Sequence, residues 1–290
     1  MTFPDFDPVL FQIGFVAIRW YALAYVAGIL LGWRYAVMLS RRDDLFAPAK
    51  SPVNAAQIDD LVLYITLGVI LGGRLGYVLF YGTMSDQPFW ENPVEVFKIW
   101  EGGMSFHGGA LGVILAVILY ARSQKVSMLR LGDLIAPVVP FGLFFGRIAN
   151  FINGELWGRP TDGPFGMVFC NQRLMDIYGP GCPTPGAGML PRHPSQLYEA
   201  GLEGVLLFTV LAVAVWKLKL LKKPGYVTGL FLLCYGLVRA VMETVREPDS
   251  FMPEALRGVI TMGMVLSLPM ILVGAWLIWR ARNRPPYTGA

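Results

Sequence analysis

The chain has 290 residues, of which 55% are hydrophobic and only 15% charged, and its mean hydropathy is +0.52. A soluble domain carries about 25% charged residues because its surface meets water, so this composition excludes a water-soluble enzyme or regulator. Three cysteines are too few for a disulfide scaffold, and two histidines leave no plausible zinc site. The net charge is +4. We therefore expect no metal, no cofactor and no nucleic-acid partner.

Apolar segments that could cross a bilayer as helices, which takes roughly 20 residues each, occur seven times. They cover about 14–38, 58–81, 106–121, 132–152, 196–216, 226–245 and 259–279, and the third and fourth are short or interrupted by Gly and Pro. We predict an all-α integral membrane protein with seven transmembrane helices, forming a single transmembrane domain over residues 1–290. The segment 154–194, between the fourth and fifth spans, is predicted to form a small periplasmic head loop.

Lysine and arginine are unevenly divided between the two sets of loops. One set is basic, for example at Arg41, Arg122 and Lys217, whereas the opposite set begins with the acidic segment 2–7. The positive-inside rule then predicts a periplasmic N-terminus and a cytoplasmic C-terminus, in a multi-pass protein of the bacterial inner membrane. In the oxidising outer compartment we predict a disulfide between Cys170 and Cys182, with Cys234 as a free thiol.

Four arginines lie at or inside the predicted spans, toward their outer ends: Arg19, Arg74, Arg147 and Arg239. Charged residues in a membrane are costly and commonly mark a functional site. For Arg19 and Arg74, an equal alternative is snorkelling to the interface or structural pairing. Because guanidinium groups bind phosphate through two hydrogen bonds, the expected ligand is the headgroup of a membrane phospholipid.

The residues after Arg147 continue this polar pattern. Arg147, Asn150 and Asn153 are spaced by three, so a helix places them on one face. Gly154 is expected to end the helix and Glu155 to turn back toward it. The pattern predicts a strip of hydrogen-bond donors for a ligand, or alternatively a helix cap with satisfied polar groups.

A second polar face is predicted around Arg239. Tyr235, Arg239 and Glu243 follow at intervals of four, and Arg246 lies one turn beyond Glu243. Two readings remain open: an Arg–Glu pair that stabilises helix packing, or a glutamate that holds Arg239 in place for an anionic ligand.

His107 stands between glycines in the segment 102–109, at the start of a predicted span. Its imidazole can accept a proton near neutral pH, although a hydrogen-bonded structural histidine is equally compatible with the pattern. His193, before Pro194, is expected mainly at a helix entry. Tyr21 could belong to an interfacial aromatic belt. No motif for a protein nucleophile is present.

Several of these segments together resemble prolipoprotein diacylglyceryl transferases. The resemblance rests on the run Gly146–Gly158, on 3–8, on 72–77, on 103–109, on 192–199 and on 235–246, and it covers essentially the whole chain. One departure is Met264, where relatives often have Gln, and it bears only on local packing.

The resemblance implies that the diacylglyceryl group of phosphatidylglycerol is transferred to the thiol of the lipobox cysteine of a preprolipoprotein signal peptide, with release of glycerol phosphate. It implies that Arg147 contacts the phospholipid and that Arg239 is essential. It also implicates further residues, all of which match here: Tyr21, His107, Asn150, Glu155, Gly158, Tyr235, Glu243 and Arg246.

This activity explains why the chain offers no nucleophile, since the thiol arrives with the peptide. A thiol attacks as the thiolate, so a base is required, and His107 is the candidate. Arg147 and Arg239 would stabilise the departing phosphate. The alternative is a lipid or anion transporter with an arginine-lined cavity, but transport predicts polar groups that continue to the cytoplasmic side. We expect the protein to act as a monomer.

Overall fold

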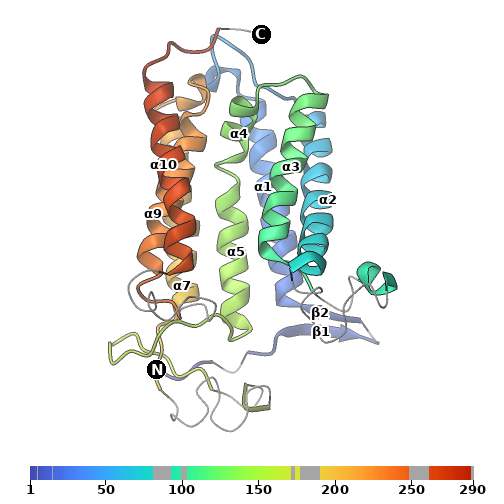
Figure 1. Cartoon of the computed structure of the whole chain (residues 1–290), viewed down its shortest axis with the longest axis vertical. Helices are drawn as coiled ribbons and strands as arrows, with labels where there is room; N and C mark the ends of the chain where they lie inside the picture. Colours follow the sequence, from blue (N-terminus) through green and yellow to red (C-terminus); the bar gives the residue numbers. More distant parts are fainter. Residues whose placement is uncertain are drawn as a thin grey trace.

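The computed structural model describes residues 1–4, 6–14, 16–80, 93–98, 103–170, 174–176, 190–247 and 261–288. Cys182 and most of the predicted acidic loop at 85–98 lie outside these residues. The described part is a bundle of helices with one small sheet (Figure 1). Its elements in chain order are β1 (Val9–Ile13), β2 (Val16–Arg19), α1 (Trp20–Ser40), η1 (Asp43–Leu45), α2 (Ala55–Phe80), η2 (Pro93–Phe97), α3 (Phe106–Ser123), α4 (Met128–Ile135), α5 (Val139–Ile152), α7 (Ser195–Glu199), η4 (Ala200–Leu206), α8 (Leu207–Ala212), η5 (Val213–Lys217), η6 (Leu220–Lys222), α9 (Tyr226–Met242) and α10 (Met262–Arg282).

Four helical stretches in the described residues are long and apolar enough to cross a membrane: α1, α2, the continuous run from α7 to η5, and α10. The pair α4 and α5, bent by 42°, would make a fifth, and α3 and α9 are shorter apolar helices. Each predicted span therefore corresponds to a helix or a helix pair, and the chain is a mostly helical protein of the multi-pass membrane type.

The first predicted span differs from the structure at its start. Residues Val16–Arg19, within the expected helix from about 14, instead form β2, which pairs with β1 in an antiparallel hairpin, and the helix begins at Trp20. The hairpin strands are rich in β-branched and aromatic residues, which favour extended backbone. Gly14, with φ of +59°, allows the turn between the strands.

Proline explains the break in the fourth predicted span. Helix α4 ends at Ile135 and α5 begins at Val139, with Pro137 between them and Pro140 in the first turn of α5. Proline has no N–H to donate and its ring clashes with the preceding turn, which favours the break between α4 and α5.

Helices α2 and α3 pack closely through glycine. A Cβ added to Gly72 would overlap the carbonyl oxygen of Gly108 and the Cα of Gly112. Small residues let two membrane helices approach this closely, and van der Waals contact between the backbones then holds the pair together.

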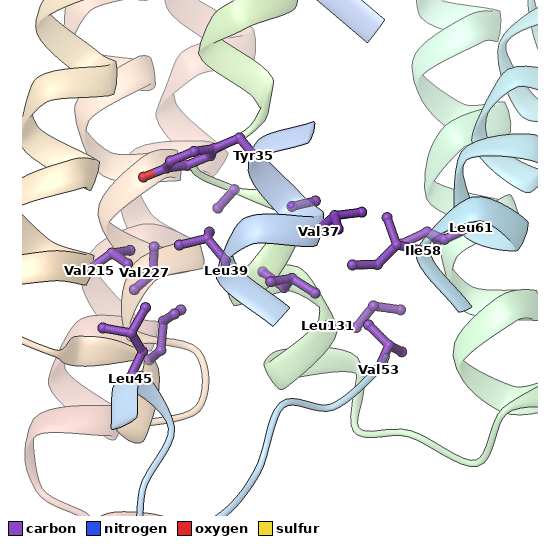
Figure 2. Close-up of a cluster of buried hydrophobic side chains, with 14 of the residues drawn as sticks. Tyr35, Val37, Leu39, Leu45, Val53, Ile58, Leu61, Leu131, Val215 and Val227 are labelled. Atoms are coloured by element: carbon purple, nitrogen blue, oxygen red, sulfur yellow. The ribbon is translucent and has the colours of Figure 1, made fainter. Parts of the chain in front are cut away.

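The main hydrophobic core lies at one end of the bundle, which we call the core end. Side chains from α1, α2, α4, η5 and α9 meet there, and Figure 2 shows Tyr35, Leu39, Leu61, Leu131 and Val227 among them. Asp133 of α4 is buried in the same region, and its carboxylate accepts hydrogen bonds from the Gly225 and Thr228 backbone amides at 2.6 and 2.7 Å. These bonds satisfy free amides at the start of α9.

The opposite end, which we call the site end, holds the N-terminus and the hairpin, whereas the C-terminus lies beyond the core end (Figure 1). A small aromatic cluster covers the site end. Phe3 packs against Phe151 and Phe169 with ring centroids 5.5 and 5.1 Å apart. Cys170 is disulfide-bonded and Cys234 is free, as predicted for these two residues.

Candidate active site

Six charged side chains form one connected cluster at the site end, which we call the arginine–glutamate network. Its members are Arg147 of α5, Glu199 of α7, Glu203 of η4, Arg239 of α9, and Glu243 and Arg246 directly after α9. The network therefore joins three segments that are distant in sequence, and it contains three positive and three negative groups.

Glu199 is the centre of this network. Its Oε2 lies 2.6 Å from Arg147 Nε, and its Oε1 lies 2.6 Å from Arg246 Nη1 and 3.9 Å from Arg239 Nη1. One carboxylate thus holds arginines from both α5 and the end of α9. The contact with Arg246 is a charge-assisted hydrogen bond, a type that is short and strong.

The carboxylate of Glu243, directly after α9, pairs with Arg239 at the predicted spacing of four residues. Arg239 Nη2 lies 2.5 Å from Glu243 Oε1, one helical turn away, and Arg246 Nε lies 3.7 Å from the same oxygen. The predicted pairing of Arg239 with Glu243 is therefore confirmed. Tyr235, one turn before Arg239, is close enough to Arg147 and Glu203 to interact with both electrostatically.

Glu203, one turn after Glu199 in the same helical run, also contacts Arg147. Its Oε2 lies 3.3 Å from Arg147 Nε, and it is part of the π-helical segment η4. The wider winding of a π-helix is often found at functional sites. Here Glu199 and Glu203 both meet the same guanidinium.

Burial separates the two kinds of charge in the network. The three carboxylates are at most 3% exposed, whereas the three arginine side chains are 16–18% exposed. Arg239 Nη1 is buried and makes no hydrogen bond within the described residues. The arginine side chains are therefore the more exposed members of the network, and one buried guanidinium nitrogen has N–H donors that no group of the described residues uses.

The polar strip predicted after Arg147 is present, and its residues contact one another. Glu155 Oε1 accepts hydrogen bonds from Asn150 Nδ2 at 2.9 Å and from Asn153 Nδ2 at 3.3 Å. The chain turns back at Gly154, whose φ is +62°, as a residue without a Cβ readily allows. Tyr21, at the start of α1, lies near the Asn150 side chain.

Gly158 lies where three segments cross closely. A Cβ added there would overlap the Val245 carbonyl oxygen and lie 2.8 Å from the His193 Cβ. The Gly158 amide donates to the His193 carbonyl at 2.8 Å, and Arg192 Nη1 donates to the Gly158 carbonyl at 3.0 Å. The contacts of Gly158 are thus with the protein backbone around the end of α9. His193 lies just before α7, as expected for a helix entry.

Three predicted candidates lie outside the network. Arg19 is exposed at the end of β2, and Arg74 donates from Nε to the Val96 carbonyl and from Nη1 to the Gly103 carbonyl, which favours the structural alternative for Arg74. His107 is exposed in the first turn of α3. Since α3 packs mainly against α2, the structure does not bring His107 into the network.

Glu199 and Glu203 were not identified from the sequence. Both lie in a predicted span, four residues apart, and buried carboxylates in a membrane helix are as costly as buried arginines. A search for the counter-ions that four arginines require would have found them. Within the described residues, no group of three His, Cys, Asp or Glu side chains could hold a metal ion.

This arrangement is suited to holding an anion. Guanidinium groups fixed from behind by carboxylates keep their orientation without rearranging when a ligand arrives, and such preorganised donors stabilise negative charge strongly in a site with little water. No cysteine, serine or lysine of the described chain forms part of the network.

Comparison with known proteins agrees with this chemistry. The profile of the family described as prolipoprotein diacylglyceryl transferase matches residues 8–280. The chain is 59% identical to the phosphatidylglycerol–prolipoprotein diacylglyceryl transferase of Caulobacter vibrioides, over 98% of this chain and 96% of that protein. It is 58% identical to the same enzyme of Phenylobacterium zucineum, over 99% and 97%, and 51% identical to that of Rhizobium meliloti, over 98% and 95%. The chain belongs to the prolipoprotein diacylglyceryl transferase family.

Proposed function

We propose that this transferase moves the diacylglyceryl group of phosphatidylglycerol to the lipobox cysteine of a preprolipoprotein, as the first step of bacterial lipoprotein maturation. The observation that carries the proposal is the Glu199-centred set of three arginines, whose side chains are the more exposed members of an otherwise buried cluster. A phosphodiester is an anion with oxygens in the geometry that guanidinium groups bind.

The chemical step needs a new carbon–sulfur bond. The cysteine sulfur, as thiolate, attacks the glyceryl carbon that bears the phosphate. The carbon–oxygen bond breaks, its electron pair leaves with the oxygen, and glycerol phosphate departs with one more negative charge. Arg147 and Arg239 would meet that charge, and contacts of this type are worth about 3–4 kcal/mol in a site with little water.

The remaining polar residues would position the two substrates. Asn150, Asn153 and Glu155 already form a hydrogen-bonded strip beside Arg147, and Tyr21 lies next to Asn150. We assign this strip to the lipid headgroup, together with Gly158 and Arg246. We assign His107 the role of the base that removes the thiol proton, because neither the substrates nor the network provides another imidazole. We place Tyr235 at the reacting end of the lipid.

We place the site end at the periplasmic face of the inner membrane. The proposal has seven spans: the five counted by length and composition, together with the shorter helices α3 and α9. Odd numbers of crossings put the N-terminus and the C-terminus on opposite sides, and the basic loops at the core end favour that end as cytoplasmic. The segment 154–194 would form the periplasmic head of a single transmembrane domain, in a monomeric enzyme.

A transporter with the same arginines would need a polar route to the core end. The packing there favours the enzyme instead, since α1, α2, α4 and α9 close that end with apolar side chains such as Leu39, Leu131 and Val227 (Figure 2).

The test is a direct transfer assay. Purified protein is incubated with phosphatidylglycerol and a peptide that carries a lipobox cysteine, and the peptide mass is followed. We expect a gain equal to one diacylglyceryl group on the cysteine. The matched controls are a peptide with Ser in place of the cysteine and phosphatidylcholine in place of the donor lipid. A folded protein that modifies no peptide would overturn the proposal.

A further inference from the structure

The charges of the arginine–glutamate network balance in the empty site. Arg147, Arg239 and Arg246 face an equal number of buried glutamates, and all six are joined by ion pairs. At the rim, Arg159 binds the backbone carbonyls of Glu243 and Arg246, while Glu155 is held by asparagines, so the rim adds one charge of each sign.

A phosphodiester that enters this balanced site brings one uncompensated negative charge. Uncompensated charge in a region of low dielectric constant costs several kcal/mol, and a protein usually avoids that cost by neutralising a group. The arginines stay protonated because their pKa lies far above neutrality. Protonation of one of the three carboxylates would remove this excess charge when the lipid binds.

The contacts of the three glutamates differ, and Glu203 is the most weakly held. Glu199 has ion pairs of 2.6 Å to two arginines, and Glu243 has one of 2.5 Å. Glu203 contacts one arginine, Arg147, with its Oε2 at 3.3 Å from Nε and 3.4 Å from Nη2, so it is farther from its nearest arginine than the other two carboxylates are from theirs. Protonation of Glu203 therefore sacrifices the least attraction.

The side chains around Glu203, on each element that packs against η4, are compatible with its protonation. Arg147 is the charged residue of α5, Glu199 is the nearest group of α7, and Tyr235 and Arg239 face it from α9. Helix α8 contributes no charged side chain. A proton on Glu203 removes the repulsion from Glu199 and frees Arg147 Nη2, which now donates to Glu203 Oε2 at 3.4 Å, for the phosphate.

We propose that binding of the lipid phosphodiester is coupled to the uptake of one proton from solvent by Glu203. Glu203 is then a positioning residue that acts through Arg147: as a carboxylate it holds the empty site together, and as a carboxylic acid it releases the guanidinium. This inference rests on the proposed lipid-binding function and adds its coupling to pH.

Isothermal titration calorimetry tests the coupling with dihexanoylphosphatidylglycerol and purified full-length protein. Binding enthalpies are measured at one pH in two buffers that differ in ionisation enthalpy, which yields the number of protons taken up. We expect about one proton per bound lipid for the parent and about none for Glu203→Gln. Glu247→Gln is the matched control, because Glu247 pairs with Arg192 outside the network at 2.6 Å, and it should behave like the parent.

A pH profile of the parent provides a second measurement that needs no variant. If a proton is taken up, the lipid Kd rises by about tenfold per pH unit on the alkaline side, while Glu203→Gln gives a flat profile. Lipid binding without proton uptake, or uptake that persists in Glu203→Gln, overturns the coupling and leaves the proposed function intact. Absence of any lipid binding to the folded parent would instead remove the proposed function itself.

Discussion

Glu199 and Arg246 meet at the site end, with Glu199 Oε1 and Arg246 Nη1 2.6 Å apart, although Glu199 ends α7 and Arg246 follows α9. The same carboxylate holds Arg147 at 2.6 Å. Because Glu199 is buried and both its oxygens are engaged, the position of each arginine depends on it. The relative placement of α5 and α9 at the site end is therefore tied to one side chain.

Replacing Glu199 with alanine should destabilise the protein by about 3–5 kcal/mol, because partly buried guanidinium groups lose their counter-charge. Unfolding by sodium dodecyl sulfate in mixed micelles, followed by circular dichroism, measures the effect. In the double variant Glu199→Ala/Arg246→Ala the loss should be smaller than the sum of the single losses. Additive losses would show that the 2.6 Å contact contributes little to stability.

Arg147 and Arg239 should differ in their kinetic roles. An arginine that only binds the lipid raises KM when removed, whereas one that stabilises the departing phosphate lowers kcat. We expect Arg147→Ala to affect mainly KM for phosphatidylglycerol. Arg239, fixed by Glu243 one turn away, should affect mainly kcat, by about 10²–10³-fold. Steady-state kinetics in mixed micelles separate the two constants.

Lysine is the matched control at both positions. It keeps the charge but loses the two-pronged guanidinium geometry, so Arg147→Lys and Arg239→Lys should recover little activity. Near-parental rates in the folded alanine variants would contradict the role of the arginines as phosphate ligands.

His107→Gln should fold and bind lipid like the parent while transfer slows, if His107 is the base. The defect should shrink as pH rises, because the peptide thiol then ionises without assistance. Transfer rates measured across the pH range distinguish the roles. A defect of the same size at every pH would assign His107 to positioning, which its exposed place on α3 also permits.

Gly158→Ala should destabilise the site end by about 1–3 kcal/mol, the usual cost of overpacking, since the added methyl group overlaps the Val245 carbonyl. Gly142→Ala on α5 is the matched control, because nothing lies within 4 Å of its added Cβ. The control should be neutral or slightly stabilising, as expected for alanine in a helix. Equal unfolding midpoints for the two variants would contradict the role of Gly158 in close packing.

Reduction of the disulfide at Cys170 should destabilise the segment 154–194 by roughly 2–3 kcal/mol, through the added freedom of the unfolded loop. Intact-mass analysis after alkylation should show one reactive thiol, Cys234, without reductant and three with it. Three labelled thiols in both samples would contradict the bond. Limited proteolysis with and without reductant then measures the effect on the loop.

Local patterns of the site were readable from the sequence. Tyr235, Arg239 and Glu243 share a face because helical periodicity fixes it, and the Asn150–Glu155 contact follows from a helix that ends at a glycine. These relationships span only a few residues, so the geometry of one helix determines them.

Relationships between helices were not readable in this way. The sequence does not say which face of the α7 segment meets α5, so the contacts of Glu199 and Glu203 with Arg147 had no local signal. The hairpin was missed for a different reason. An apolar run without clear periodicity is compatible with either a helix or a strand, and the turn at Gly14 decides between them.

The packing of Phe3 has a consequence for the order in which this chain can assemble. The Phe3 amide donates to the Val168 carbonyl at 2.9 Å, and its ring contacts Phe151 and Phe169. Phe151 lies near the end of α5, and Val168 and Phe169 follow that helix, so Phe3 has none of these partners until α5 has been synthesised. Completion of the site end is thus a late event in biogenesis, and a chain stalled before residue 169 leaves Phe3 exposed.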